Sequence, residues 1–423
     1  MVRAVDIFTP TDVPTITYVE RTKKNYEDDL RRAFSIPKMI VSISGPSKSG
    51  KTVLVTKVVA PENLIHIYGA SIKKIEDLWE NVVAWMGGPI QRSQSREINT
   101  GIDVSGTVGG KAGIPFIAEG KAELNGGISL NSSNTMTESF APVGVDDIAR
   151  EIGDSEFIIF LDDFHYIQKD VREEIGKEIK AAAEKGVRIC TASVPHRSDD
   201  VVRSNTELRG RVTAIDMTYW ATEELVQIAE KGFRNLNVTV GPATLNRMAE
   251  EAFGSPQLMQ AICLNFCFER NILETNISNR MVNESEINFL QILERTSTTS
   301  DFSTMLNTLH AGPKLRGTER KIFKFVDQTS GDVYRCVLLA LKANPASLSF
   351  RYDEMLKRTR EVCVDDSPVG SSVSESLSQM AKLAKTVQDE PTIEWDEDVL
   401  DIVEPYFLFY LRCSSHLLRL ALH

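Results

Sequence analysis

One short segment constrains the fold of this chain more than any other part of the sequence. An apolar, β-prone run over residues 39–44 (MIVSIS) is followed at once by GPSKSGKT and then by VLVTKVV, which suits a helix. The pattern GxxxxGK[ST] between a strand and a helix is typical of a loop that binds phosphate groups. We therefore predict an α/β fold in which residues 45–52 form a phosphate-binding loop.

Each residue type in this loop has a chemical reason to be there. Glycines let the backbone curl until its N–H groups face the phosphates, and the next helix adds its positive end. Lys51 is expected to reach the β- and γ-phosphates of ATP, and the Thr52 hydroxyl to coordinate Mg²⁺. Lys48 is also compatible with a solvated place on the outer rim. We expect nucleotide contacts from the whole loop and the next residue: Gly45, Pro46, Ser47, Lys48, Ser49, Gly50, Lys51, Thr52 and Val53.

A second segment supplies the acids that such a site needs. Residues 157–161 (FIIFL) form an unbroken apolar run, as a strand covered on both faces requires, and Asp162 and Asp163 follow directly. Acids at the carboxyl end of such a strand lie where ligands bind in open α/β sheets. We assign Asp162 to Mg²⁺ and Asp163 to orienting or activating the attacking water. The alternative is that both acids only cap the next helix.

The neighbouring segments alternate between helix and strand. Residues 169–185 form a mostly polar helix that ends at Gly186, and residues 64–68, 187–194 and 212–217 are the other expected strands. This alternation predicts a mostly parallel sheet covered by helices. Near the end of the strand over 187–194, Thr191 and Ser193 either touch the γ-phosphate or the water, or are core residues bonded to backbone.

The composition shifts sharply after an expected helix over residues 71–86. Residues 101–130 alternate apolar with small or polar residues and are rich in glycine, which predicts one or two β-hairpins inserted at about residues 90–140. Three roles stay open for this insertion: a partner-binding or self-associating arm, a plain surface hairpin, or a membrane-inserting hairpin. Stable membrane insertion is the least expected, because the faces are weakly hydrophobic.

The rest of the chain is expected to be largely helical. Residues 221–297 predict a small helical lid whose angle reports the nucleotide state, with Cys263 and Cys267 packed in its core. Residues 296–304 are the best linker by composition. A third domain is expected over residues 304–423, with helices at 317–327, 333–342 and 373–387 and a strand-prone end at 401–412.

Composition narrows the class of protein. With a net charge of −11, non-specific nucleic-acid binding is not the default interpretation, and DNA contact would need a local basic surface. Six scattered cysteines without a CxxC pair argue against a zinc site and a disulfide framework. The sequence has no run of about 18 apolar residues and no signal-peptide core. We expect a soluble, cytoplasmic, multidomain protein.

These motifs together resemble the P-loop NTPases of the AAA+ and STAND superfamilies, especially relatives of origin-recognition-type initiator ATPases. GPSKSGKT and LDDF are similar to their Walker A and Walker B motifs, and VRICTASVPHR to their sensor-1 strand, where Ser193 lies. The segment LRGRV falls where AAA+ proteins carry an arginine finger, which implies that role for Arg209 or Arg211; solvated loop arginines are the alternative. The segment TYVER resembles the part that brackets adenine, which implies nucleotide contacts from Tyr18, Val19 and Arg21.

Two departures from the AAA+ pattern favour a switch over a processive motor. GSPQ is closer to the GxP motif of STAND proteins, whose proline contacts the nucleotide from the lid, and this implies that role for Pro256. The residue after the Mg²⁺ ligand is Asp instead of Glu, which is consistent with slow hydrolysis. The end of the chain resembles a winged-helix domain, including a closing phrase D-P-Y-F…Y-L-R in which Glu404 takes the first place.

The resemblance implies an ATP-binding and ATP-hydrolysing switch that forms homo-oligomers and controls a partner protein effector. By the same resemblance, compact prokaryotic proteins of this build often act in defence against phage or in mobile-element control. The alternative is a DNA-binding ATPase of the initiator or transposition-regulator type, for which the expected recognition helix offers only Lys382 and Lys385 as bases. A scaffold in which the nucleotide is structural and is not hydrolysed is a third reading.

Overall fold

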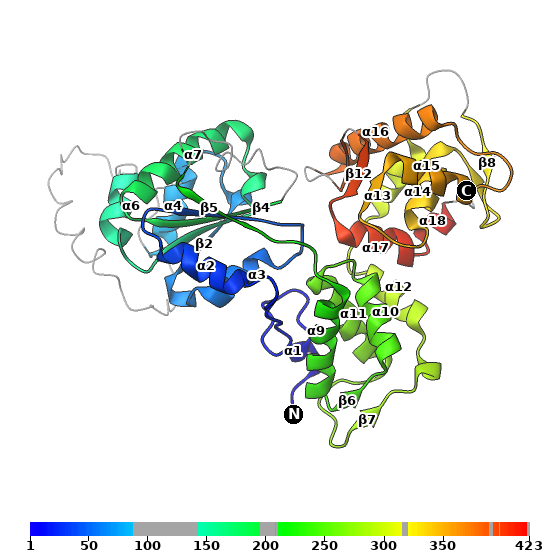
Figure 1. The fold of residues 1–423 in the computed structure, drawn as a ribbon, viewed down its shortest axis with the longest axis horizontal. Coiled ribbons are helices and arrows are strands. Elements are labelled where there is room, and N and C mark those ends of the chain that lie inside the picture. The colour runs from blue at the N-terminus through cyan, green and yellow to red at the C-terminus, as the bar shows by residue number, and fades with distance from the viewer. Residues whose placement is uncertain are drawn as a thin grey trace, which may run out of the picture. The chain divides into compact units, whose positions relative to one another are not determined.

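The computed structural model describes residues 1–87, 143–194, 208, 210–314, 320–388, 392–396 and 398–420. The hairpin insertion expected at about 90–140 and the candidate finger Arg209 lie outside the described residues. The chain divides into two compact units. One comprises residues 25–44 and 54–216, and the other residues 1–24, 45–53 and 217–423. Each is described by itself (Figure 1).

The first unit is built on a five-stranded parallel sheet of order β2-β3-β4-β1-β5. Its strands are rich in Ile, Val, Leu and Phe, and β1 and β3 are buried along their whole length, as interior strands of a parallel sheet must be. This confirms the predicted sheet. The strands are β1 (Ile40–Ser44), β2 (Leu64–Tyr68), β3 (Ile158–Asp162), β4 (Arg188–Ser193) and β5 (Val212–Asp216).

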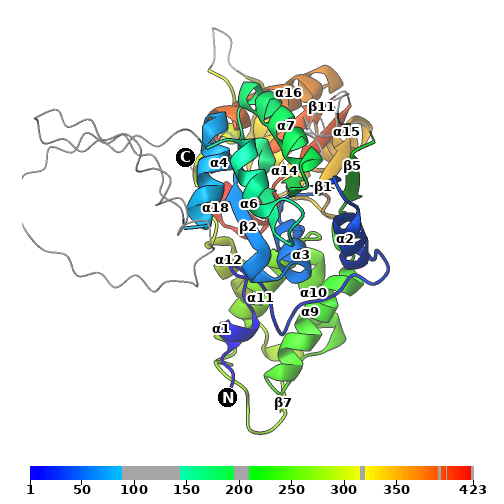
Figure 2. The same ribbon diagram turned by 90° about the vertical axis from the view of Figure 1, so that its left-hand side faces the viewer.

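Helices cover both faces of this sheet, as Figures 1 and 2 show. One face carries α4 (Ile75–Trp85), α6 (Val145–Ile152) and α7 (Lys169–Glu184), whose apolar sides pack on the strands. The other face carries α2 (Tyr26–Ser35) and α3 (Lys51–Val58). The helix expected over 71–86 begins later, at Ile75, after one short helical turn. The single turns are η1 (Pro61–Asn63), η2 (Gly69–Ser71) and η3 (Phe164–Tyr166).

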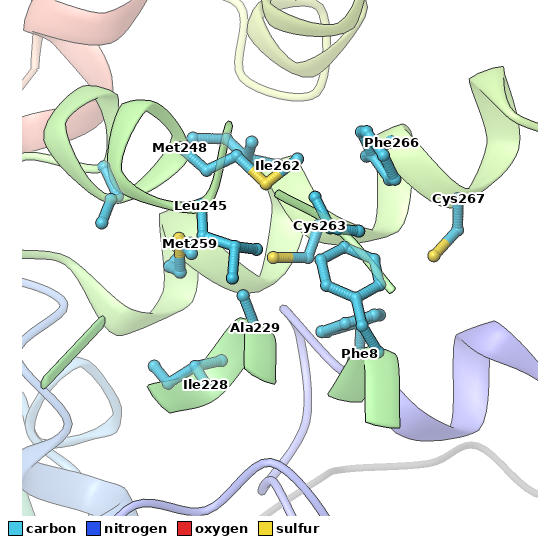
Figure 3. Packing of buried hydrophobic residues seen from close by; sticks show 14 of the residues in the cluster. Phe8, Ile228, Ala229, Leu245, Met248, Met259, Ile262, Cys263, Phe266 and Cys267 are labelled. Atoms are coloured by element: carbon cyan, nitrogen blue, oxygen red, sulfur yellow. The ribbon is translucent and has the colours of Figure 1, made fainter. Parts of the chain in front are cut away.

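The helices predicted to form a lid, which keep that name below, belong to the second unit and have their own apolar core. Figure 3 shows Cys263 and Cys267 of one helix among Phe8, Ile262 and Phe266, and burial raises the pKa of both thiols. The packing role predicted for the two cysteines is confirmed. The elements are α1 (Ala4–Ile7), α9 (Thr222–Asn235), β6 (Val238–Thr239), α10 (Pro242–Glu251), α11 (Pro256–Glu269), β7 (Arg280–Met281), η6 (Glu284–Glu286) and α12 (Phe289–Ser297).

The C-terminal domain combines helices with a three-stranded antiparallel sheet of order β10-β12-β11. Its helices pack their apolar faces on this sheet around Phe350, Leu377 and Leu400. The elements are α13 (Ser303–Ala311), β8 (Phe323–Lys324), β9 (Ser330–Gly331), α14 (Val333–Lys342), β10 (Ser349–Arg351), α15 (Tyr352–Glu361), α16 (Gly370–Val387), β11 (Ile393–Asp396), β12 (Val399–Ile402), α17 (Pro405–Cys413) and α18 (His416–Arg419).

Three expectations about the second half of the chain are wrong. The linker expected at 296–304 begins inside α12, where Thr296 and Ser297 are buried. The helix expected at 317–327 contains the strand β8 in its described part. The strand-prone end at 401–412 is mostly the helix α17.

The helix α17 belongs to two apolar cores at once. Tyr406 and Phe409 pack with the lid, whereas Phe407 and Leu411 pack inside the C-terminal domain. Next to them, the guanidinium of Arg412 donates both to Glu251 of α10, at 3.1 Å, and to the carbonyl of Lys342 at the end of α14. The lid and the C-terminal domain therefore share one helix.

Candidate functional site

The phosphate-binding loop begins directly after β1 and folds around its own lysine. Lys51, at the start of α3, is only 7% exposed, and its Nζ donates to the carbonyls of Gly45 and Pro46, each at 2.9 Å. Gly50 has φ of +95°, a conformation that L side chains rarely adopt. Lys48 is exposed. The loop thus keeps one ammonium group inside its curve and one at its rim.

Two further features of the loop fit an anionic ligand. The Ser49 hydroxyl is buried and has no hydrogen-bond partner among the described residues. Buried hydroxyls are normally bonded, so a ligand oxygen would complete this one. At Gly45 a Cβ would meet Met217 Cβ at 2.8 Å, so only glycine lets the loop curve this closely past Met217. Gly45 thus permits the curvature of the loop, and the buried Ser49 hydroxyl fits a bound phosphate.

A carboxylate from the C-terminal domain contacts the same loop. The Ser47 hydroxyl donates to Oε2 of Glu404 at 3.1 Å. The other oxygen of Glu404 caps α17 by accepting from the Tyr406 amide at 3.1 Å. The pKa of Tyr219 is raised well above its ordinary value, mainly by burial and then by the nearby carboxylates of Glu404 and Asp401. The loop thus has a negative charge as a neighbour before any phosphate arrives.

Asp162 ends β3 with a carboxylate that is buried and held by hydrogen bonds. Its Oδ1 accepts from the Asp163 amide at 3.0 Å, and its Oδ2 lies 3.1 Å from Nε2 of His66 on the neighbouring strand β2. Since an ionised carboxylate can only accept, the imidazole donates through Nε2. Phe160 stacks on the same ring, with 5.0 Å between centroids. Asp162 is therefore oriented from a second strand.

Asp163 starts the turn η3 in the left-handed conformation, with φ of +51°. A side chain at Gly69 would collide with the Asp163 carbonyl oxygen, so the chain after β2 approaches this turn as closely as a backbone can. The two acids thus have different settings, since Asp162 is buried and Asp163 is half-buried. That difference suits a metal ligand followed by a group that meets water.

Ser193 is the last residue of β4 and is buried. In the parallel register it lies opposite Ser44, the last residue of β1 before the loop. Thr191 lies opposite Ser42, and its buried hydroxyl has no hydrogen-bond partner among the described residues. The structure thus places Ser193 at the sheet edge where the phosphate-binding loop begins, and Thr191 within the sheet.

Arg211 is at the opposite edge of the sheet. It immediately precedes β5, and its carbonyl accepts from the amide of Ile40, the first residue of β1. Its guanidinium is half-exposed and forms an ion pair with Glu184 at 2.7 Å. Parallel strands place their first and last residues at opposite edges of the sheet. Arg211 is therefore remote from the carboxyl ends of the strands in the same copy of the chain.

The segment expected to bracket adenine packs against the lid. Val19 is buried in the lid core, and the Tyr18 carbonyl accepts from Lys231 of α9 at 2.6 Å. Arg21 is 4% exposed and makes a two-pronged ion pair with Glu224 at 3.1 and 3.0 Å. Burial of Glu224 is outweighed by hydrogen bonds from Arg21 and the Ala221 amide, so its pKa is lowered. Arg21 thus anchors the segment to α9.

Pro256 is the first residue of α11, a position that suits proline because the first amide of a helix has no partner inside the helix. Before it, Ser255 caps the helix by accepting from the Leu258 amide at 3.2 Å, and Gly254 has φ of +71°. The GSPQ segment therefore forms a tight turn, in which Pro256 is half-buried.

Three residues that contact the predicted site residues were not themselves predicted from the sequence: His66, which bonds Asp162, Glu404, which bonds Ser47, and Trp220, whose indole donates to the Ser49 carbonyl at 2.9 Å. Of these three, only His66 is marked by its sequence context. It is a polar residue within the apolar run LIHIY, and a polar side chain in a buried strand needs a hydrogen-bond partner. Glu404 was noticed only as a departure from the D-P-Y-F phrase.

His66→Ala is expected to raise the Mg²⁺ concentration for half-maximal ATPase activity about tenfold, because groups that orient metal ligands typically contribute 10- to 100-fold. His66→Asn keeps a donor on β2 and should lose less. The measurement is phosphate release as a function of Mg²⁺ concentration. An unchanged half-maximal Mg²⁺ concentration in His66→Ala would mean that the imidazole only fills the space beside Phe160.

Within the described ranges, no helix is both long and apolar enough to cross a bilayer, and no group of three or more His, Cys, Asp or Glu side chains is placed to hold a metal. Mg²⁺ sites of nucleotide-binding proteins commonly need only one or two protein oxygens, because phosphates and waters supply the others. Thr52 and Asp162 provide oxygens of the right kind.

No known protein family and no curated protein sequence matches this chain. Among solved structures, the Walker-type ATPase of Pyrococcus abyssi is similar over 94% of this chain and 99% of its own, with a TM-score of 0.51 at 13% identity. A further structural neighbour is the Aeropyrum pernix ORC2 protein, with a TM-score of 0.49 at 10% identity over 99% of this chain and 98% of its own. Another is Cdc6p from Pyrobaculum aerophilum, with a TM-score of 0.45 at 10% identity over 100% of both chains. The sheet order, the loop after β1 and the likeness to the Pyrococcus protein over nearly the whole chain together show that this chain has a P-loop NTPase fold.

Proposed function

We propose that this chain is an ATP-binding and ATP-hydrolysing regulatory switch that forms homo-oligomers and controls a partner effector. The observation that carries the proposal is the hydrogen bond between Ser47 of the phosphate-binding loop and Glu404 of the C-terminal domain. It gives the nucleotide site a physical connection to a second domain. A role in prokaryotic antiphage defence, which the sequence resemblance suggests, is part of the same proposal.

The roles of the residues follow from their chemistry. Lys51 presents a fixed ammonium group to the β- and γ-phosphates, and the amides of the loop donate to phosphate oxygens. Thr52 and Asp162 would hold Mg²⁺, and the ion would supply positive charge against the phosphates. Asp163 orients the attacking water and Ser193 contacts the γ-phosphate or that water. A base as short as aspartate is consistent with slow hydrolysis.

Oligomer formation would complete the catalytic site. Because Arg211 precedes β5 at the amino edge of the sheet, its cation can serve a phosphate only in another copy of the chain. Its partner Glu184 would then have to release it. Arg209 is the other candidate for the same role. Arginine fingers contribute about 10³- to 10⁵-fold to the hydrolysis rate, so activity is expected to depend on assembly.

The switch itself would rest on electrostatic competition. The Glu404 carboxylate and the ATP phosphates are both negative, so binding of one at the loop opposes the presence of the other. Glu404 starts α17, the helix shared by the lid and the C-terminal domain. Displacement of Glu404 by ATP would therefore move an element on which both domains depend, and free the C-terminal domain for its effector.

Glu404→Gln is expected to tighten ATP binding about fivefold, because it removes one like charge worth about 1 kcal/mol beside the loop. Calorimetric titration with ATP and Mg²⁺ measures this. Asp396→Asn, an exposed acid on β11, is the matched control, since it changes the charge of the same domain by the same amount. Equal affinities in the two variants would contradict the competition.

A DNA-binding ATPase of the initiator or transposition-regulator type is the second candidate. It is supported by the order of α14, β10, α15, α16, β11 and β12, which resembles that of a winged helix and gives α16 the place of the recognition helix. The charges oppose it, because α16 exposes only Lys382 and Lys385 as bases while β11 exposes Asp396. Salt-sensitive DNA binding that is lost in Lys382→Glu/Lys385→Glu would favour this candidate over a protein-binding domain.

A further inference from the structure

We propose that Trp220 is a positioning residue that orients the Ser49–Gly50 peptide of the phosphate-binding loop for a phosphate and couples that peptide to the turn that leads into the lid helix α11. The inference rests on the proposed function, because it assumes that the loop binds ATP. It goes beyond that function by naming how occupancy of the loop reaches the lid.

The side chain of Trp220 holds one peptide of the loop. Its Nε1–H donates to the Ser49 carbonyl oxygen at 2.9 Å. A peptide unit is planar and trans, so its C=O and the following N–H point in opposite directions. By fixing the Ser49 oxygen, the indole therefore aims the Gly50 N–H away from itself, and Gly50 sits at φ of +95°, where glycine alone turns freely. This amide is one of those expected to face the phosphates.

The backbone of Trp220 holds the lid. Its amide donates to the carbonyl of Gly254 at 3.1 Å. Gly254 is the αL residue of the turn that leads into α11, and a Cβ there would meet Tyr219 at 2.7 Å, so the two chain segments touch directly. One residue thus bonds the phosphate-binding loop through its side chain and the turn before Pro256 through its main chain.

The ring of Trp220 is itself held in place. The guanidinium of Arg21 lies 5.1 Å from the ring centroid, a cation–π distance. Arg21 is fixed in turn by Glu224 and by the carbonyls of Thr218, at 2.8 Å, and Tyr219, at 3.1 Å. The indole is therefore not a freely rotating side chain. A turn of the Ser49–Gly50 peptide upon phosphate binding would act on a rigid group and pass to the lid.

The test compares Trp220→Phe with the wild type. Phenylalanine keeps an aromatic ring for Arg21 but removes the donor to Ser49. Trp395→Phe, in β11 of the C-terminal domain, is the matched control. Two quantities are measured with ATP and Mg²⁺: the affinity by calorimetry, and the slowing of amide hydrogen exchange in residues 254–262 at saturating ATP.

We expect Trp220→Phe to bind ATP about fivefold more weakly, the usual effect of losing one hydrogen bond. We also expect it to lose the ATP-induced slowing of exchange in the lid turn, while Trp395→Phe keeps both. A purely structural role would speed exchange equally with and without ATP, and that result would overturn the inference. So would wild-type behaviour of Trp220→Phe in both measurements, and the proposed function would then still stand. If the wild-type chain binds no ATP, the proposed function fails and the inference falls with it.

Discussion

Lys51→Ala is expected to lower the affinity for ATP at least 100-fold. The Lys51 ammonium is held inside the loop by the carbonyls of Gly45 and Pro46, so its charge is already in position and partly desolvated. A buried charge–phosphate interaction is far stronger than a surface ion pair, which typically contributes about 1 kcal/mol or less. Calorimetric titration with ATP and Mg²⁺ measures the loss.

The matched control for this prediction is Lys177→Ala. It removes an exposed lysine from α7 and changes the net charge by the same amount. It should bind ATP as the wild type does. Lys51→Ala with an affinity within threefold of Lys177→Ala would show that ATP, if bound, does not rely on this loop.

Asp162→Asn is expected to reduce ATP hydrolysis by about 100-fold or more, an effect of the size seen when one group that stabilises transition-state charge is removed. The amide keeps the shape of the side chain and an oxygen that can accept the Asp163 N–H, so the fold should persist. What is lost is the negative charge that attracts Mg²⁺. Phosphate release under saturating ATP measures the rate, and raised Mg²⁺ should recover part of it.

Asp163→Asn distinguishes the role of Asp163 from that of Asp162. It should also slow hydrolysis, because it removes the group that orients water, but added Mg²⁺ should not restore the rate. If Mg²⁺ rescues Asp163→Asn and not Asp162→Asn, the roles of the two acids are exchanged. If neither substitution changes the rate, hydrolysis does not occur at the end of β3.

The sheet and the loop could be predicted because their signals are local. A buried parallel strand needs an unbroken apolar run, and both β1 and β3 have one directly before the residues of the site. His66, Glu404 and Trp220 could not be assigned in this way. Each contacts a predicted residue from a segment distant in sequence, and only the folded chain shows that Trp220 meets Ser49, 171 residues earlier.

Local composition also gave two wrong predictions of secondary structure, each with a physical reason. Thr296 and Ser297 suggest a linker, yet both are buried at the end of α12. Their hydroxyls are satisfied inside the helix, because they donate to carbonyls one turn back, to Ile292 at 2.8 Å and Glu294 at 2.7 Å. The aromatic run of α17 suggests a strand. Glu404 as N-cap and Pro405 as first residue instead start a helix, and they were the stronger signal.

ATP bound at the loop is expected to drive assembly of this chain into the proposed homo-oligomer. Light scattering measures the solution mass of the wild type and of Lys51→Ala with and without ATP and Mg²⁺. We predict a mass increase only for the wild type with ATP. A mass that responds neither to ATP nor to the loss of Lys51 would contradict the oligomerising switch.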